Sequence, residues 1–236
     1  NERPSEDKVS DEPVDPDWVA RFFENVKDVS NEHVQKLWGR LLAGEIAIPG
    51  KFSLRTLDVL RNLTSDEARL FERYCGYCSH IGEIVIPEGK EFLQATGIRM
   101  NDLKQLVECG LLHDGKEFMK SSSTDAKPHA IVFYSRVLKM TPVAPSPITA
   151  SSLFEELTQP HGSPGSDART KSHFGDHLMR STLTGYVFTL TTVGFELASL
   201  RPSTTNEQYV AALAGSIREK GFSVEEVLLT VSKEKE

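Results

Sequence analysis

The strongest constraint on the fold is a run of four amphipathic helical patterns between residues 16 and 81. Each pattern follows a residue that favours a helix start, and the connections between the patterns are short. The predicted starts are Asp15 before Pro16, Ser30, Ser53, and Thr64 with Glu67 three residues later. Because each apolar stripe has to be buried against another element, residues 16–81 are expected to form a four-helix layer.

The pattern changes after residue 82. A β-branched run at 84–86 predicts a short strand, residues 88–96 predict a helix ended by Gly97, and Asn101 is the predicted start of a helix reaching Cys109. Residues 111–112 and 131–134 predict two strands joined by a long hairpin loop, and residues 186–190 predict a strand that closes the same sheet. Helix, turn, helix and hairpin in this order are typical of a winged helix.

The expected fold class is therefore α+β and predominantly α. A helical layer at 16–81 is expected to pack on a winged-helix-like module at 82–200 with a small antiparallel sheet. The Pro-, Ser-, Thr- and Gly-rich residues 141–181 are interpreted as a loop-rich insertion in that module, and a helix and strand are expected at 201–236.

The charge is unevenly distributed. The formal net charge is -7, but residues 1–17 alone hold seven acidic and two basic side chains, so the rest of the chain is nearly neutral. Residues 1–15 are expected to be a flexible acidic leader because they contain too few apolar side chains to offset the entropy of ordering. Nucleic acid binding is disfavoured because neither part of the chain supplies a basic footprint.

Two further features indicate the compartment. No apolar run approaches the ~18 residues that a membrane helix needs, so no membrane span is expected. The chain has three cysteines, an odd number that suits a reducing compartment better than a secreted disulfide framework. A cytoplasmic location is therefore expected.

Cys75 and Cys78 have the spacing of a redox pair, and His80 follows closely enough to suggest a zinc ligand. They also continue an apolar stripe of a predicted helix, and free cysteine behaves as a small buried hydrophobe. A core pair is favoured, while a redox or zinc site remains an alternative. No metal or other cofactor is expected.

Glu45 lies seven residues after Trp38, beside the apolar stripe of the second predicted helix. A carboxylate at such a position needs a partner. Arg55, just past the Pro49-Gly50 turn, or Arg40 is the expected partner in a structural tie.

The winged-helix interpretation raises the possibility of DNA contacts. The outward positions of the predicted recognition helix are Asp102, Lys104, Gln105 and Glu108. The two acidic side chains would repel DNA phosphates, and none of the four positions holds an arginine that could bind guanine. The candidate wing holds Lys116, Lys120 and Lys127, so the DNA alternative has Lys104 and these three lysines as its weak contact candidates.

The residues from Trp38 to Glu45, continuing through Pro49-Gly50, Ser53 and Arg55-Thr56-Leu57, resemble a bacterial family of unknown function. The chain is also similar, more distantly, to the abortive infection alpha family, with matching pieces at residues 66–71, 109–112 and 190–194. The resemblance implies a cytoplasmic bacterial protein tied to phage defence or to a mobile element, and transfers no catalytic residue.

The leading hypothesis is a non-enzymatic protein-interaction or sensing module that self-associates and binds a protein partner of unknown identity. A DNA-binding winged-helix regulator is the first alternative. A zinc or redox protein that uses Cys75 and Cys78 is the second.

Overall fold

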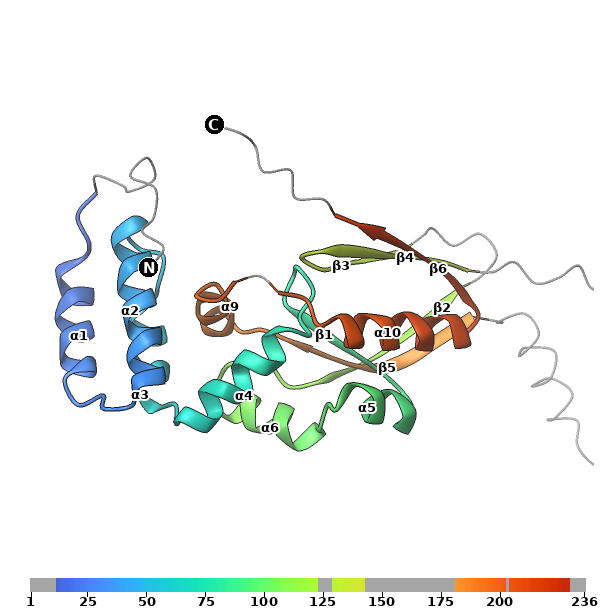
Figure 1. Ribbon diagram of the computed structural model, residues 1–236, viewed down its shortest axis with the longest axis horizontal. Helices are drawn as coiled ribbons and strands as arrows, with labels where there is room; N and C mark the ends of the chain where they lie inside the picture. The colour runs from blue at the N-terminus through green and yellow to red at the C-terminus, as the bar shows by residue number, and fades with distance from the viewer. Residues whose placement is uncertain (1–11, 123–128, 143–180, 203, 230–236) are drawn as a thin grey trace, which may run out of the picture.

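Four helices form the N-terminal part of the computed structural model, which describes residues 12–122, 129–142, 181–202 and 204–229 of the 236-residue chain (Figure 1). They are α1 (Pro16–Val26), α2 (Glu32–Ala47), α3 (Leu54–Asn62) and α4 (Ser65–Cys75). All four helices were predicted from the sequence. Helix α1 packs on α3, and α2 packs on α4.

The helix starts show how local the sequence signals are. The side chain of Ser53 accepts a hydrogen bond from the Thr56 N–H, and Thr64 with Glu67 forms the predicted capping box. The predicted start at Ser30 is wrong, because Asn31 caps α2 and accepts hydrogen bonds from two backbone N–H groups of the first turn. The fourth helix also ends earlier than expected, at Cys75 instead of about residue 81.

The first sheet contains β1 (Glu83–Pro87), β5 (Ser181–Thr189) and β2 (Lys116–Ser122), antiparallel and in this order. Helices α5 (Lys90–Thr96) and α6 (Met100–Glu108) lie between β1 and β2 in sequence. Gly185 allows β5 to approach β1, because a Cβ at this position would collide with the backbone of Ile86 and Pro87.

The predicted N-cap of the sixth helix, Asn101, is wrong by two residues. Helix α6 begins at Met100, and Arg99 takes the N-cap position without a side-chain cap bond. A tertiary contact fixes this start, because the Tyr74 hydroxyl oxygen accepts a hydrogen bond from the Arg99 N–H (3.0 Å).

The second sheet contains β3 (His129–Val132), β4 (Arg136–Pro142) and β6 (Phe222–Leu228), again antiparallel and in this order. The predicted hairpin between residues 111–112 and 131–134 is therefore wrong. Strand β2 pairs with β5, whereas β3 pairs with β4 in the other sheet. The expected insertion at 141–181 lies largely outside the described residues, and its two ends belong to β4 and β5.

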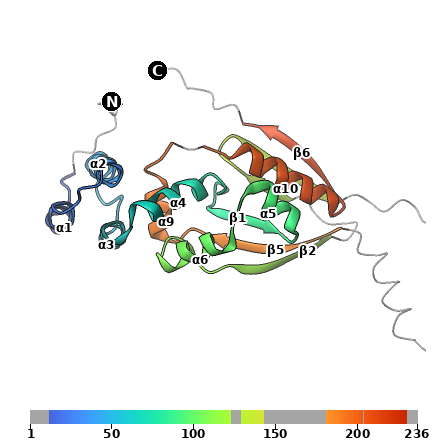
Figure 2. The ribbon, with the colours of Figure 1, turned by 60° about the horizontal axis from the view of Figure 1, so that its bottom comes forward.

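Helix α10 (Glu207–Glu219) is the centre of the core, and α9 (Thr192–Ala198) packs on α3. Figures 1 and 2 show α10 running along both sheets, and it contacts β1 and α5 as well as β6. Five of its side chains are inaccessible to solvent: Tyr209, Val210, Leu213, Ala214 and Ile217. A helix buried on several sides joins the two sheets into one hydrophobic core.

Tyr209 also closes the free edge of β1. Its hydroxyl accepts a hydrogen bond from the Val85 N–H (3.0 Å) and donates one to the Val85 carbonyl oxygen (2.9 Å). These two backbone groups point away from β5, on the outer edge of β1 in the first sheet. Without the Tyr209 hydroxyl, they would lack a hydrogen-bond partner. Burial raises the pKa of the Tyr209 hydroxyl, so it keeps its proton at neutral pH.

The fold is α+β, as the sequence predicted. Across the described ranges, no helix has the combined length and apolar character that crossing a bilayer would require.

Candidate functional site

Helix α6 and strands β2 and β5 form the face to which the sequence assigned the DNA contacts. Asn101, Lys104, Gln105 and Glu108 are the exposed polar side chains of α6. A three-residue connection joins α5 to α6, and its Gly97 has a positive φ of 68° that suits a tight helix exit. The arrangement presents one side of α6 to solvent.

Asp102 does not lie on that exposed side, so its predicted outward orientation is wrong. Only 6% of the residue is accessible. Its carboxylate accepts hydrogen bonds from Arg73 (2.6 Å) and from the Tyr74 hydroxyl (3.1 Å), and Arg99 lies 3.0 Å away on the other oxygen. A buried carboxylate needs such partners, and two arginines supply them here.

A groove opens beside α6, between the two helices and the first sheet. Its volume is about 610 Å³. The lining is drawn from β1 and the turn after it, α5, α6, the start of β2 and β5, and consists of Ile86, Pro87, Glu88, Gly89, Lys90, Leu93, Met100, Lys104, Asp114, Gly115, Tyr186 and Phe188. This size is typical of pockets that bind drug-sized molecules or a few side chains of a partner.

The floor of the groove is apolar. Ile86 and Phe188 are almost fully buried, whereas Leu93 and Met100 are partly buried and Tyr186 stands exposed at the rim. Gly115 lets its backbone pack directly on the Phe188 ring, because a Cβ there would approach the ring to 2.5 Å.

The charges of the groove are segregated. Lys90 and Lys104 come from the helices, and in the described part of the chain neither forms an ion pair. The strand side carries carboxylates that already accept hydrogen bonds, Glu88 from the Thr184 hydroxyl (2.8 Å) and Asp114 from the Gly115 N–H (2.9 Å). The two lysines and two carboxylates of the lining therefore balance, with the positive charges on the helical wall and the negative charges on the strand side.

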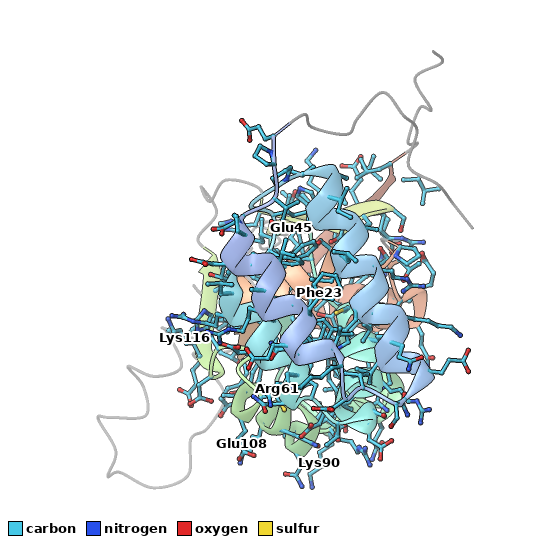
Figure 3. All side chains as sticks on the ribbon, turned by 90° about the vertical axis from the view of Figure 1, so that its left-hand side faces the viewer. Phe23, Glu45, Arg61, Lys90, Glu108 and Lys116 are labelled. Carbon is cyan, nitrogen blue, oxygen red and sulfur yellow. The ribbon has the colours of Figure 1, made fainter. Side chains whose placement is uncertain are left out.

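The remaining predicted DNA contacts lie along β2. Lys116 and Lys120 are exposed on this strand, with Glu117 between them, and Lys127 lies outside the described residues. The Glu117 carboxylate accepts a hydrogen bond from the Tyr186 hydroxyl (3.3 Å), and its negative charge raises the pKa of that hydroxyl. Figure 3 shows Lys116 at one side of the molecule, and Lys90 and Glu108 at the end formed by α5 and α6. Basic and acidic side chains are thus mixed across the face.

Glu45 is buried as expected, but the expected arginine partner is wrong. Its carboxylate accepts hydrogen bonds from the backbone N–H groups of Gly50 (2.6 Å) and Phe52 (2.9 Å). Arg55 and Arg40 are both exposed, and neither pairs with Glu45 in the described structure. Glu45 therefore shapes the Pro49-Gly50 turn that connects α2 to α3.

The aromatic residues around this turn show what the segment from Trp38 to Arg55, which resembles the family of unknown function, does in the structure. Trp38 is buried and packs edge-to-face on Phe22, with ring centroids 5.4 Å apart. The Trp18 indole N–H donates a hydrogen bond to the Phe52 carbonyl oxygen (2.9 Å), which ties α1 to the same turn. The segment from Trp38 to Arg55 thus builds a packed corner between three helices.

Cys75 and Cys78 lie in the core, next to each other near the end of α4. Burial raises the pKa of the Cys75 thiol to about 11 and raises that of Cys78 well above its usual range. His80 is exposed and contacts the ring of Tyr134. Within the described ranges, no group of three or more His, Cys, Asp or Glu side chains is placed to hold a metal ion. Neutral, buried thiols are poor nucleophiles and poor metal ligands.

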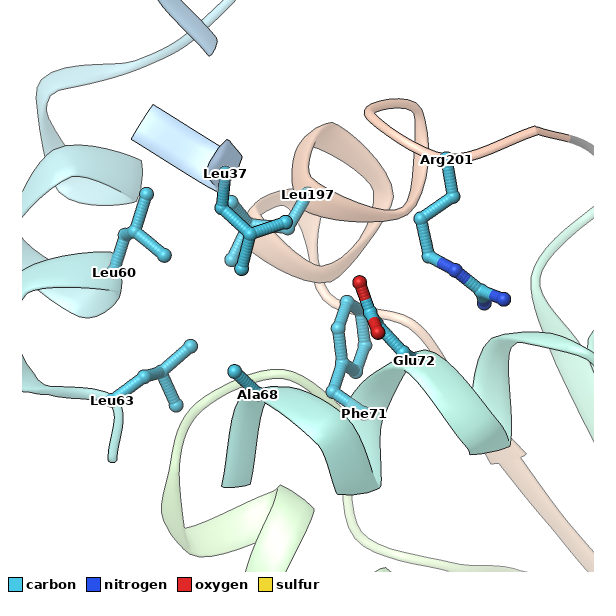
Figure 4. Close-up of a pocket in the computed structure, with 8 residues that line it drawn as sticks. All are labelled: Leu37, Leu60, Leu63, Ala68, Phe71, Glu72, Leu197 and Arg201. Carbon is cyan, nitrogen blue, oxygen red and sulfur yellow. The ribbon is translucent and has the colours of Figure 1, made fainter. Parts of the chain in front are cut away.

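A second, much smaller cavity lies between α2, α3, α4 and α9 (Figure 4). Its volume is about 10 Å³, which is enough for at most one water molecule. Leucine side chains from three helices point into it, while Glu72 and Arg201 stand at one side. This cavity is a packing gap and not a ligand site.

Sequence reasoning missed the groove, and Lys90, Tyr186 and Phe188 are among the lining residues that it assigned to no site. The lysine lies in a predicted helix start, and the two aromatic residues lie in a predicted strand about 100 residues away. No local signal indicates that these segments meet, because the pairing of β5 with β1 and β2 is a long-range contact.

Comparison with known proteins gives one family. Residues 2–85 match the model of a family described as "Protein of unknown function (DUF2806)", which confirms the expected likeness to a family of unknown function for this part of the chain. The match covers the four N-terminal helices and reaches into β1. No curated protein and no solved structure matches the chain.

Proposed function

We propose that this chain is a non-enzymatic protein-interaction or sensing module of a bacterial cytoplasmic protein, built around a winged-helix-like unit. Two features support that unit: the element order α4, β1, α5, α6, β2, followed after β3 and β4 by β5, and the sheet order β1-β5-β2. The three-residue turn between α5 and α6 is typical of helix-turn-helix units. In this proposal β2 and β5 replace the hairpin that the sequence predicted as the wing.

The groove beside α6 is the observation that carries the proposal. A DNA backbone offers no apolar groups to cover the accessible apolar lining at Leu93, Met100 and Tyr186, whereas a protein segment does. Carboxylates at Glu88, Asp114 and Glu117 line the path from the groove to the wing, where phosphates would be repelled. Winged-helix units that bind protein tolerate such mixed charge.

The DNA-binding alternative is favoured by one observation, the inward orientation of Asp102. Because two arginines neutralise this carboxylate, the exposed side of α6 carries one acid less than the sequence suggested. Lys104, Lys116 and Lys120 remain its contact candidates.

A titration distinguishes the two functions. We would measure the fluorescence anisotropy of a labelled duplex of about 20 base pairs at salt concentrations of about 50 and 200 mM. The protein-interaction function predicts no saturation below roughly 100 µM, and equal behaviour of wild type and K116E/K120E. Tighter binding that falls steeply with salt and with K116E/K120E would establish the DNA alternative instead.

Self-association is the second part of the proposal, and the open face of the second sheet supports it. Val132, Val137 and Val227 form one row across the three strands, and Val132 and Val227 are 37% and 42% exposed. The next row contains the ion pair of Lys139 with Glu225 (3.2 Å), so the surface is apolar and electrically balanced. Such a surface does not repel its own copy, and two-fold homodimers are the commonest oligomers.

Light scattering coupled to size exclusion tests this part. Val227→Lys places a charge at the more exposed end of the row and is expected to convert the oligomer into a monomer. Ile48→Lys is the matched control, because it removes an exposed apolar side chain elsewhere, at the end of α2. A wild-type monomer, or equal effects of the two variants, would refute the role of this face.

A role in phage defence belongs to the proposal through the resemblance to the abortive infection alpha family. Its test compares the plating efficiency of phages on bacteria with and without the gene. A role predicts reduced plating on the carrying strain and its recovery in a strain that expresses Val227→Lys. Equal plating on both strains would remove this part.

A further inference from the structure

Helices α1 and α2 leave an apolar stripe exposed on their outer side. On α1 the stripe contains Val19, Phe23 and Val26 at helical spacing, and on α2 it contains Leu42 and Ile46. Phe23 and Ile46 are 60% and 49% exposed, whereas the other three side chains are partly buried. Figure 3 shows Phe23 between the two helices, in the middle of the face that they form. An exposed apolar face of this kind is typical of a protein contact.

Gly39 lies on the same side of α2, three residues before Leu42. It is exposed, and a Cβ at this position would meet no atom within 4 Å. Glycine inside an exposed helix is unfavourable relative to alanine, and packing within the chain does not require it here. What glycine permits at this point is the close approach of another chain to the backbone of α2.

The charges beside the stripe make the face complementary to itself. Along α1, Glu24 is followed by Lys27, and along α2, Glu32 is followed by Lys36, all of them exposed. Lys36 pairs with Glu32 in its own helix, whereas in the described part of the chain neither Glu24 nor Lys27 forms an ion pair. Because α1 and α2 are antiparallel, the two acid-base pairs run in opposite directions along the face. A second copy therefore presents Lys36 to Glu24, and Glu32 to Lys27, when its α2 lies on α1.

The heights of these residues along the helices agree with this arrangement. Phe22 packs on Trp38 with ring centroids 5.4 Å apart, so these two positions lie at the same height. Glu24 and Lys36 are each two residues from them, in the same direction along the pair of helices, and are also level. A two-fold axis parallel to the helices keeps these heights and places α1 of each copy on α2 of the other.

We propose that the outer face of α1 and α2 binds the same face of a second copy. Phe23 of each copy packs beside Gly39 of the other, and Glu24 faces Lys36. This inference goes beyond the proposed function, in which self-association uses the second sheet.

The contact is weak, because Phe23 and Ile46 are the only strongly exposed side chains of the stripe. A dissociation constant on the order of 0.1 to 1 mM is expected. Figures 1 and 2 place α1 and α2 at the opposite end of the molecule from the second sheet, so both contacts form at once. Oligomers held by the second sheet therefore associate further at high local concentration, through a second self-complementary face.

The test uses the complete chain carrying Val227→Lys, which removes the contact through the second sheet and leaves α1 and α2 unchanged. Sedimentation equilibrium is expected to show a monomer at ~10 µM and pairs at ~1 mM. The wild-type chain, measured alongside, is expected to pass from its oligomer to larger species over the same range. A Val227→Lys chain that stays monomeric at ~1 mM, with a wild type that gains no mass, overturns the inference.

Gly39→Leu is the sharpest variant. The added side chain has space in a single copy but not against Phe23 of a second copy, and leucine favours the helix, so the fold is preserved. In the Val227→Lys chain, Gly39→Leu and Phe23→Lys are each expected to weaken pairing at least tenfold. Met119→Lys is the matched control, because it removes an exposed apolar side chain from β2, and it changes pairing less than twofold. Equal effects of Phe23→Lys and Met119→Lys overturn the inference.

A charge exchange identifies the occupant as a second copy. Glu24→Lys and Lys36→Glu each place like charges opposite one another, and each is expected to weaken pairing about threefold. The double variant E24K/K36E exchanges the two charges and is expected to restore pairing to within about twofold of the starting chain. Single variants that weaken pairing without recovery in the double variant overturn the arrangement of α1 on α2.

The inference and the proposed function fail separately. A wild-type monomer at ~10 µM refutes the contact through the second sheet and leaves pairing through α1 and α2 to be read at ~1 mM. A wild-type oligomer at ~10 µM whose mass does not rise at ~1 mM supports the proposed function and overturns the second contact.

Discussion

Replacing Glu45 by glutamine tests whether backbone hydrogen bonds or an arginine hold the corner between α2 and α3. The Glu45 carboxylate accepts from the N–H groups of Gly50 and Phe52, at 2.6 and 2.9 Å, and only 1% of the residue is exposed. Glutamine retains one acceptor oxygen, but its NH₂ group then faces the other N–H, which leaves a buried donor without a partner.

The expected cost follows from these contacts. Hydrogen bonds to a charged group contribute about 1.5 to 3 kcal/mol each, and a buried unsatisfied donor costs about 1 to 3 kcal/mol. Losing one bond and weakening the other therefore destabilises Glu45→Gln by about 3 kcal/mol. For a chain of this size, that corresponds to a fall of roughly 6 to 12 °C in Tm.

Urea denaturation of Glu45→Gln and Arg55→Ala distinguishes the two accounts. The backbone account predicts a loss of about 3 kcal/mol for Glu45→Gln and less than about 0.5 kcal/mol for Arg55→Ala, because Arg55 is exposed. Equal losses of 2 kcal/mol or more in both variants would show that the arginine holds the carboxylate, and would refute the reasoning.

Three further predictions concern buried or capping groups. Tyr209→Phe removes both hydrogen bonds to Val85 and is expected to cost about 2 to 4 kcal/mol in urea denaturation; a loss below about 0.5 kcal/mol would contradict the edge-closing role. Because the pKa of Cys75 is raised to about 11 from an ordinary value of 9.0, stability is fully present below pH 9 and declines as the pH rises toward 11, by about 2 kcal/mol for this thiol. Cys75→Ala should flatten that decline, and in the native protein Cys75 and Cys78 should react with a thiol reagent only at the rate of unfolding. The pKa of Glu67 is lowered, chiefly by the hydrogen bond from its helix cap, so its contribution is present above its ordinary pKa and is lost as the pH falls through the lowered value. The Tm difference between wild type and Glu67→Gln should therefore disappear at low pH, and a difference that persists at pH 2 would contradict the assignment.

The sequence predicted those parts of the fold that depend on neighbouring residues. Ser53, the pair Thr64 and Glu67, and Gly97 were identified correctly as helix boundaries, because each acts on backbone groups within four residues. Apolar periodicity likewise located the helices of residues 16–75.

The predictions were wrong where a residue distant in the sequence determines the local structure. The helix after Gly97 starts earlier than predicted because Tyr74 holds the N–H of Arg99, and Asp102 turns inward because Arg73 is there to pair with it. Neither contact has a local signal in the sequence. Strand pairing failed for the same reason, since β2 skips its neighbour in sequence and pairs with β5, more than 50 residues farther along the chain.

The candidate site was predicted only in part. Lys104 was identified as an outward residue of a possible recognition helix, and it lines the groove. The accessible apolar lining at Leu93 and Met100 was not foreseen, because these residues look like ordinary apolar positions of two separate helices. The close packing of Gly115 on the Phe188 ring, which leaves no room for a Cβ, likewise becomes informative only when the strands are placed side by side.

The most direct test of the central claim, that this protein acts through protein contacts, is native mass spectrometry of the chain purified without chelator or nuclease. The account predicts an oligomer whose mass is accounted for by copies of the chain alone. A monomer at all concentrations would contradict the proposed self-association. A bound nucleic acid would contradict the interaction function and favour the winged-helix DNA alternative, and a zinc-sized increment would indicate a metal site at Cys75 and Cys78.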